Sequence, residues 1–392
     1  MHLVESYATN CGVRIDKPYI YEKFFPLDFE KYITFSTSLI PSQDYDFWAD
    51  VITIIKDKFR EEEIQILQLG EKGCKAPPNV FSVCGMATKN QEAYLIKNSM
   101  LHFGIDNHIS QLAGHYNKKI VCAYANNHKE DVKPYWGDNK NQILIESDRE
   151  GNKPSFAAQE FPKTINMIKP EKIAKAIFDL LGFDFKFGYK TLGSGNNYLN
   201  KIIETVPNQV IGSASLNISA IIVRMDFFFE ENNLCRQLED CVCSIVTNKS
   251  IDSNILLKYK HKIKEIIYFI EKENDPKFIE FLEYHGIKFL LLSSIEGKEL
   301  ESIKLDYMDY GIIHPKKIPD FSEHKDKKNL YFKSSKLTLS NSKMYLSKYH
   351  HKNDIPCSNQ DDIQKVVDDE EFWEESDYYM LLEKTKTKTN RK

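Results

Sequence analysis

The residues with the clearest capacity for chemistry are Asp106 and Asn107, which lie between an apolar strand and a helix. Either side chain can cap a helix whose apolar residues recur on one face, at Ile109, Leu112, Ala113 and Tyr116. A helix N-terminus carries unpaired N–H groups and positive dipole character, and in α/β proteins this edge commonly holds a phosphate. The segment Met100–Asn126 therefore predicts either an anion-binding edge or a structural strand–helix–strand unit with an ordinary cap.

The composition is that of a globular protein with no strong attraction to nucleic acid. The 392 residues are enough for two domains, and 42% of them are hydrophobic. The formal net charge is −4, and residues of both charges are abundant, so no overall electrostatic field favours binding to nucleic acid. The basic run Lys384–Lys392 predicts a frayed tail, with weak nucleic-acid contact as the alternative.

The sequence predicts a cytoplasmic protein without a membrane span. No apolar run approaches the roughly 20 residues that cross a bilayer, and the N-terminus lacks the layout of a signal peptide. Eight cysteines in a chain of this length do not indicate a disulfide scaffold. Cys235, Cys241 and Cys243 have no second Cys/His pair at zinc spacing, so core packing is favoured over a metal site.

Strands alternate with helices in the first half of the chain, which predicts a Rossmann-like α/β domain. Residues 1–30 form an N-terminal linker segment, with a short helix followed by an extended stretch. The domain spans 31–190 and closes with a helix that Pro170 begins and Gly182 ends.

A second α/β alternation follows the Gly/Ser/Asn-rich stretch 186–197 and predicts a second Rossmann-like domain over 198–314. Its last helix is expected at 297–310. Residues 315–392 are expected to form a small mixed C-terminal extension with short strands, a closing helix at 368–383 and the basic tail.

Three motifs of the first domain occur in a characteristic order and spacing. They read CGMAT at 84–88, GIDNHISQLA at 104–113 and IKPEKIA at 168–174. Together they resemble the nucleotide-sugar half of the ADP-heptose:lipopolysaccharide heptosyltransferase family, which has G-x-(T/S), then G-x-D-S-G-P-x-H-x-A, then I-x-P-E-x-(V/I)-A. The resemblance covers residues from about 20 to 182. It implies a GT-B glycosyltransferase that needs no metal or other cofactor and takes a nucleotide diphosphate sugar as its donor.

The resemblance also implies where the donor binds. The start of the helix after Asp106 would meet the diphosphate. Ser36–Ser38 follow the first strand and can donate hydrogen bonds to the same group, or else cap a turn. Gly70 and Glu71 follow the second strand, where a carboxylate can bind ribose hydroxyls or simply be solvated. The full set of donor-binding candidates is Ser36, Thr37, Ser38, Gly70, Glu71, Gly85, Thr88, Asp106, Asn107, His108, Ser110 and Gln111.

The chain departs from the family motif at two positions. The family glycine falls at His108 and the family histidine at Gln111. Without this glycine, the backbone cannot approach a phosphate as closely. A second hypothesis is therefore a catalytically degenerate GT-B-fold protein that acts as a binding or structural module.

A further match lies at 221–230, IIVRMDFFFE, which resembles the family's opening strand and turn, I-x-(I/V)-(R/K)-x-x-x-x-G-D. The family's last acidic residue is its proposed base near the acceptor hydroxyl, and it falls on Glu230, while Phe229 replaces the glycine. This implies a circularly permuted arrangement with the donor domain first and an acceptor-like domain second. A chance strand-like match is the alternative. The implied acceptor is a glycan or another hydroxyl compound.

Overall fold

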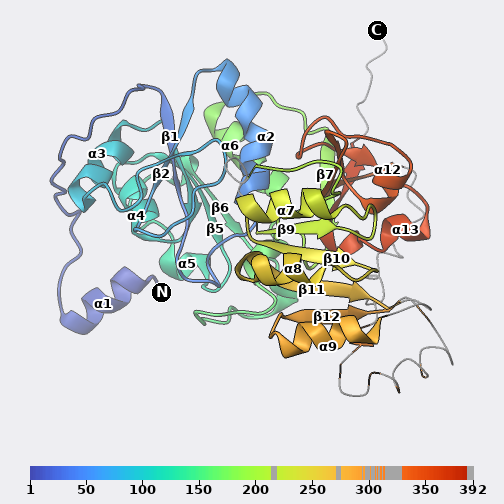
Figure 1. The fold of residues 1–392 in the computed structure, drawn as a ribbon. Helices are drawn as coiled ribbons and strands as arrows, with labels where there is room; N and C mark the ends of the chain where they lie inside the picture. The colour runs from blue at the N-terminus through green and yellow to red at the C-terminus, as the bar shows by residue number, and fades with distance from the viewer. Residues whose placement is uncertain are drawn as a thin grey trace, which may run out of the picture. The chain divides into compact units, whose positions relative to one another are not determined.

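The structure, a computed structural model, describes residues 1–212, 219–270, 275–293 and 329–385, with seven single positions from 295 to 313. The chain divides into two compact units, Met1–Gly188 and Tyr189–Lys392. Each unit contains a largely parallel sheet with helices, so the predicted α/β class is confirmed (Figure 1). The helix predicted at 297–310 lies largely outside the described residues, as does the tail from residue 386 onward.

The first unit is built on a six-stranded parallel sheet in the order β3-β2-β1-β4-β5-β6. Its strands are β1 (Tyr32–Ser36), β2 (Gln65–Leu69), β3 (Phe81–Ser82), β4 (Leu101–Ile105), β5 (Lys119–Tyr124) and β6 (Gln142–Glu146). Its α-helices are α1 (Leu3–Cys11), α2 (Trp48–Glu61), α3 (Lys89–Asn98), α4 (His108–His115), α5 (Lys129–Val132) and α6 (Pro170–Leu181). Every residue of β1 and β4 is buried, as expected for central strands covered on both faces.

Helices cover the two faces of this sheet in pairs. α2 packs with α6, and α3 packs with α4 (Figure 1). On the first face, Trp48 of α2 contacts the stacked rings of Phe35 and Phe103. On the other face, Leu95 of α3 and Ile109 of α4 belong to one buried apolar cluster with strand residues. The apolar spacing of each helix is therefore what places it on the sheet.

The closing helix of the first unit forms as predicted. α6 begins at Pro170 and ends before Gly182, whose φ of +79° is the left-handed conformation of a helix C-cap. The short helix predicted near the N-terminus is α1, which Gly12 ends in the same way, with a φ of +64°.

In the second unit, the described residues form an eight-stranded sheet in the order β13-β12-β11-β10-β9-β8-β15-β16. All its strand pairs are parallel except β15–β16. Its strands are β8 (Ile202–Thr205), β9 (Ala220–Arg224), β10 (Cys243–Thr247), β11 (Ile263–Phe269), β12 (Phe289–Leu292), β13 (Ile312–Ile313), β15 (Lys336–Ser340) and β16 (Lys343–Tyr345). The helices between them are α7 (Glu231–Asp240), α8 (Ser253–Lys258) and α9 (Pro276–Tyr284).

Residues 329–385 complete the second unit and do not form a separate extension. β15 pairs with β8 in the parallel sheet, and a four-stranded sheet has the order β17-β14-β18-β7. The remaining elements are β7 (Tyr189–Ser194), β14 (Leu330–Ser334), α12 (Lys348–Lys352), β17 (Gln364–Lys365), α13 (Glu370–Trp373) and β18 (Tyr379–Lys384).

The prediction of one closing helix over 368–383 is wrong. The segment forms the single turn α13, a 3-10 turn at Ser376–Tyr378 and the strand β18. β18 pairs on one side with β14 and on the other with β7. These two ladders pair the backbone N–H and C=O groups of β18, and Tyr379–Leu382 are buried. Pairing with distant strands therefore overrides the helical spacing of the apolar residues in this segment.

Candidate functional site

The strand order of the first unit places a topological switch point at the carboxyl ends of β1 and β4. The chain leaves β1 toward β2 on one side and leaves β4 toward β5 on the other side. Such a reversal separates the two loops, and ligands of open α/β sheets bind in the resulting crevice. The loop after β1 begins at Thr37, and the loop after β4 consists of Asp106 and Asn107.

β1 and β4 approach each other closely at this edge. A Cβ at Gly104 would collide with the backbone oxygen and the hydroxyl of Ser36, so only glycine fits at that position. Ser36 is fully buried, and its Oγ lies 3.3 Å from Nε2 of His102. Burial holds the pKa of His102 down to about 3, which makes this ring a neutral core group.

Asn107, and not Asp106, caps α4. Its Oδ1 accepts hydrogen bonds from the N–H groups of Ile109 at 2.9 Å and Ser110 at 3.2 Å. The Oγ of Ser110 accepts in return from the N–H of Asn107 at 3.3 Å, which completes a capping box. The Nδ2 of Asn107 donates to Ser36 Oγ at 3.0 Å. The cap therefore joins α4 to the end of β1, and it uses two of the first three N–H groups of the helix.

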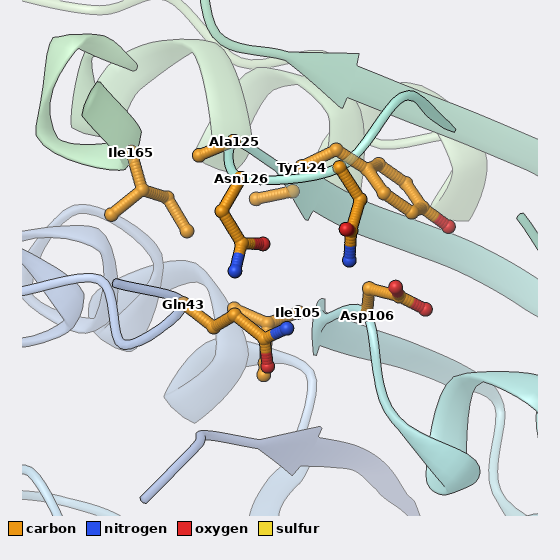
Figure 2. Close-up of a pocket in the computed structure, with 9 residues that line it drawn as sticks. Gln43, Ile105, Asp106, Tyr124, Ala125, Asn126 and Ile165 are labelled. Atoms are coloured by element: carbon orange, nitrogen blue, oxygen red, sulfur yellow. The ribbon is translucent and has the colours of Figure 1, made fainter. Parts of the chain in front are cut away.

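Asp106 is the acidic group of the crevice. Burial raises the pKa of its carboxyl to about 6, and a hydrogen bond with Asn127 opposes this shift. Figure 2 shows Asp106, Gln43 and Asn126 around a small cavity of about 10 Å³, which is room for one water molecule. Asp106 also lines a larger groove of about 620 Å³.

The hydroxyl groups that follow β1 are bound within the protein. Thr37 Oγ1 accepts from Gln68 Nε2 at 3.3 Å. Ser38 Oγ accepts from the N–H of Ile40 at 2.9 Å and lies 3.4 Å from Gln43 Oε1. Thr37 is buried and Ser38 half-buried, so Ser38 is the more accessible donor of the two.

His108 and Gln111 occupy the two positions where the chain departs from the family motif. Nε2 of His108 lies 3.0 Å from the buried carboxylate of Glu92 and 2.6 Å from Nζ of Lys89. The sequence did not single out Lys89, which places a cation at the start of α4. Gln111 donates from Nε2 to the oxygen of Val132 at 2.8 Å, and its Oε1 accepts from the N–H of Tyr135 at 3.2 Å. Its amide therefore fixes the segment after α5.

The candidates near β2 and β3 form a turn. The N–H of Gly85 donates to the oxygen of Gly70 at 2.9 Å, and both residues have positive φ. A Cβ at Gly85 would lie 2.7 Å from Cβ of Lys72, so glycine is required there. Glu71 is exposed in this turn, and Thr88 caps α3.

Glu230 lies in the second unit as the N-cap of α7, where Oε1 accepts from the N–H of Asn232 at 3.0 Å. The sequence did not predict the buried ion cluster on the same sheet. Glu204 binds Arg224 and Lys336, each at 2.8 Å, and Lys336 binds Glu375 at 2.6 Å. All four side chains are nearly inaccessible to solvent, so each buried charge depends on its partners in the cluster.

Among the described residues, no group of three or more His, Cys, Asp or Glu side chains is arranged to hold a metal ion. In the same part of the chain, no helix has the length and apolar character to cross a membrane.

Several solved structures similar to this chain are glycosyltransferases. The glycosyl transferase family 9 protein from Veillonella parvula is 16% identical over 45% of this chain and 50% of that chain, with a TM-score of 0.32. ADP-heptose lps heptosyltransferase II of E. coli is 13% identical over 45% and 50%, with a TM-score of 0.31. E. coli heptosyltransferase WaaC with ADP is 14% identical over 45% and 54%, with a TM-score of 0.30.

The match thus spans about half the length of each of these structures. No protein-family model and no curated protein matches the sequence. Heptosyltransferases, the family that the sequence motifs resemble, are among the solved structures similar to this chain.

Proposed function

We propose that the first unit binds a nucleotide diphosphate sugar and that the protein transfers the sugar to a hydroxyl acceptor. The observation that carries this proposal is the topological switch point between β1 and β4, where Asn107 bonds Ser36 and Thr37 at the end of β1 and Asp106 precedes it in the loop after β4. The three motifs in the order of the heptosyltransferase family support the same donor class.

In the proposed reaction, the acceptor oxygen attacks the anomeric carbon of the donor sugar as the bond from that carbon to the diphosphate oxygen breaks. The hydroxyl proton passes to a carboxylate, for which the family resemblance implies Glu230. The nucleoside diphosphate leaves with both electrons of the broken bond. Lys89 and the N-terminus of α4 are the proposed groups that stabilise its negative charge.

A binding module without catalysis is the second candidate, and the geometry of α4 favours it at two points. The Asn107 cap already satisfies the N–H groups of Ile109 and Ser110, which an anion would otherwise use. Gln111, in the place of the family histidine, binds backbone groups with both ends of its amide.

Calorimetry with ADP-glucose and UDP-glucose tests the donor site. We expect the wild-type protein to bind at least one of them and Asp106→Ala to bind it at least about tenfold more weakly. Asp57→Ala is the matched control, because that carboxylate is 73% exposed on α2. If neither nucleotide sugar binds, the proposed function is wrong.

Release of nucleoside diphosphate with a sugar acceptor separates the enzyme from the binding module. In Glu230→Gln we expect donor binding to persist while turnover falls about a hundredfold or more. Unchanged turnover in this variant would refute Glu230 as the base. Binding of the donor by the wild type without any turnover would establish the binding module instead.

A further inference from the structure

We propose that the groove beside α4 binds the apolar part of a hydroxyl-bearing acceptor, such as an alkyl or aryl glycoside. The groove has a volume of about 620 Å³ and lies wholly in the first unit. Pockets for small organic ligands have volumes of this order, with apolar walls and a few polar groups. The choice of an acceptor as the ligand rests on the proposed function.

One face of α4 forms a wall of the groove. His108, Gln111, Leu112 and His115 all line it, and their spacing places them on one side of the helix. The opposite side, with Ile109 and Ala113, is buried against the sheet.

The N-terminal segment and residues 132–136 supply the other walls. Nε2 of His2 lies 2.8 Å from the oxygen of Lys133, and its ring contacts Tyr135 at 4.8 Å between centroids. Gln111 binds the same segment from α4. These contacts hold the start of α1 across from α4, so the residues predicted to be a linker form part of a concave surface.

The surface that α1 contributes is apolar and open. Leu3 and Val4 line the groove and remain 48% and 37% exposed, while Ala8 on the same helix is buried. Apolar side chains gathered in a concave surface gain free energy when a ligand covers them.

A polar anchor lies on α4 within this apolar lining. The side chain of His115 lines the groove, His115 is 9% exposed, and its Nδ1 is buried with no hydrogen-bond partner among the described residues. Burial lowers the pKa of this ring, so it is neutral at pH 7 and can exchange one hydrogen bond with a hydroxyl group. A buried ring nitrogen without a partner is costly, and a ring rotated toward the groove would accept a hydrogen bond from a ligand hydroxyl there.

The groove shares Asp106 with the small cavity at the proposed donor site. Asp106 and His108 line it, as does Lys89, which contacts His108. The charges here are of both signs, so they do not select a strongly charged ligand. A molecule with its apolar part along α4 would hold a hydroxyl group near Asp106, where the donor is proposed to bind.

Calorimetry of the full chain, without any nucleotide sugar, tests this inference. The probes are n-octyl β-D-glucopyranoside below its critical micelle concentration and methyl β-D-glucopyranoside, which has the same sugar without the chain. We expect the octyl glycoside to bind at least about tenfold more tightly, because the groove buries its methylene groups. Equal affinities, or no binding of the octyl glycoside, would overturn the proposal.

A pair of substitutions on α1 locates the site. Val4→Asp places a charge in the apolar wall and should weaken binding of the octyl glycoside at least about fivefold. Tyr7→Asp is the matched control, because Tyr7 is 64% exposed on the same helix and does not line the groove. We expect its affinity to stay within about twofold of wild type. An equal loss in both variants would contradict the assignment.

Val4 is the second residue of α1, where an acidic side chain suits the helix dipole, so Val4→Asp is expected to fold. His115→Phe provides an independent variant that keeps an aromatic ring but removes both ring nitrogens, and it should also bind the octyl glycoside at least about fivefold more weakly. If His115→Phe binds the octyl glycoside with wild-type affinity, His115 is not a polar anchor for this ligand.

The donor and acceptor results are separable. Binding of the octyl glycoside without binding of any nucleotide sugar would refute the proposed function and leave the groove assignment standing. The reverse result would refute the groove alone.

Discussion

Replacing Asn107 by alanine tests the claim that this cap joins α4 to the first strand of the sheet. The change removes the Oδ1 that accepts from Ile109 and Ser110, a loss that costs about 1 kcal/mol and up to about 2 for a well-formed cap. It also removes the bond from Nδ2 to the buried Ser36 Oγ, which contributes about 1 kcal/mol. We expect the unfolding free energy of the first unit to fall by about 2–3 kcal/mol.

Asn107→Ser divides this loss into its two parts. Serine is a comparable N-cap, but its side chain is too short to reach Ser36, so the expected cost is only about 1 kcal/mol. Urea unfolding, followed by pulsed hydrogen exchange in peptides spanning residues 101–124, measures both variants. Asn152→Ala, on an exposed position, is the control and should change stability by less than about 0.5 kcal/mol. Equal losses for Ala and Ser, or a loss below about 0.5 kcal/mol for Ala, would refute the reasoning.

Two further predictions concern buried charges. The carboxyl of Asp106 has a pKa raised to about 6, so its contribution to stability is fully present below about pH 4 and is lost as the pH rises through about 6. Urea unfolding between pH 4 and 7 should therefore show a decline of up to about 3 kcal/mol in the wild type that is absent from Asp106→Asn; identical pH profiles would contradict it. In the second unit, Lys336→Met leaves Glu204 and Glu375 without a shared cation and should cost about 3–5 kcal/mol. Lys343→Met breaks an exposed pair and should cost less than about 1 kcal/mol, and similar losses for the two variants would argue against a buried cluster.

The fold class could be predicted because local patterns carry it. The apolar strand before Asp106 and the helix that Pro170 begins and Gly182 ends are both present at the expected positions. Each depends on residues that are close in sequence. The helix prediction for 368–383 failed for the converse reason. The structure of this segment is set by pairing with β14 and β7, whose residues are distant in the chain.

The position of the candidate site could be predicted from the sequence more easily than the contacts within it. The sequence placed Asp106 and Asn107 at the junction of a strand and a helix, which is where they lie, but it left open which of them is the cap. Asn107 is the cap, and its side chain also bonds Ser36, a residue 71 positions away in the chain. Lys89 and the N-terminal residues His2 and Val4 have no motif, so only their positions in space connect them with α4.

By itself, the sequence determined that strands and helices alternate, where α4 and α6 lie, and which family the motifs of the first unit resemble. Periodicity, caps and short motifs act between neighbours in the chain, so these features can be recognised without a structure. Only the tertiary structure decided the order of the strands, the partners of Gln111 and the groove between α1 and α4. These depend on contacts between distant segments, which packing and hydrogen bonding select and which no local pattern records.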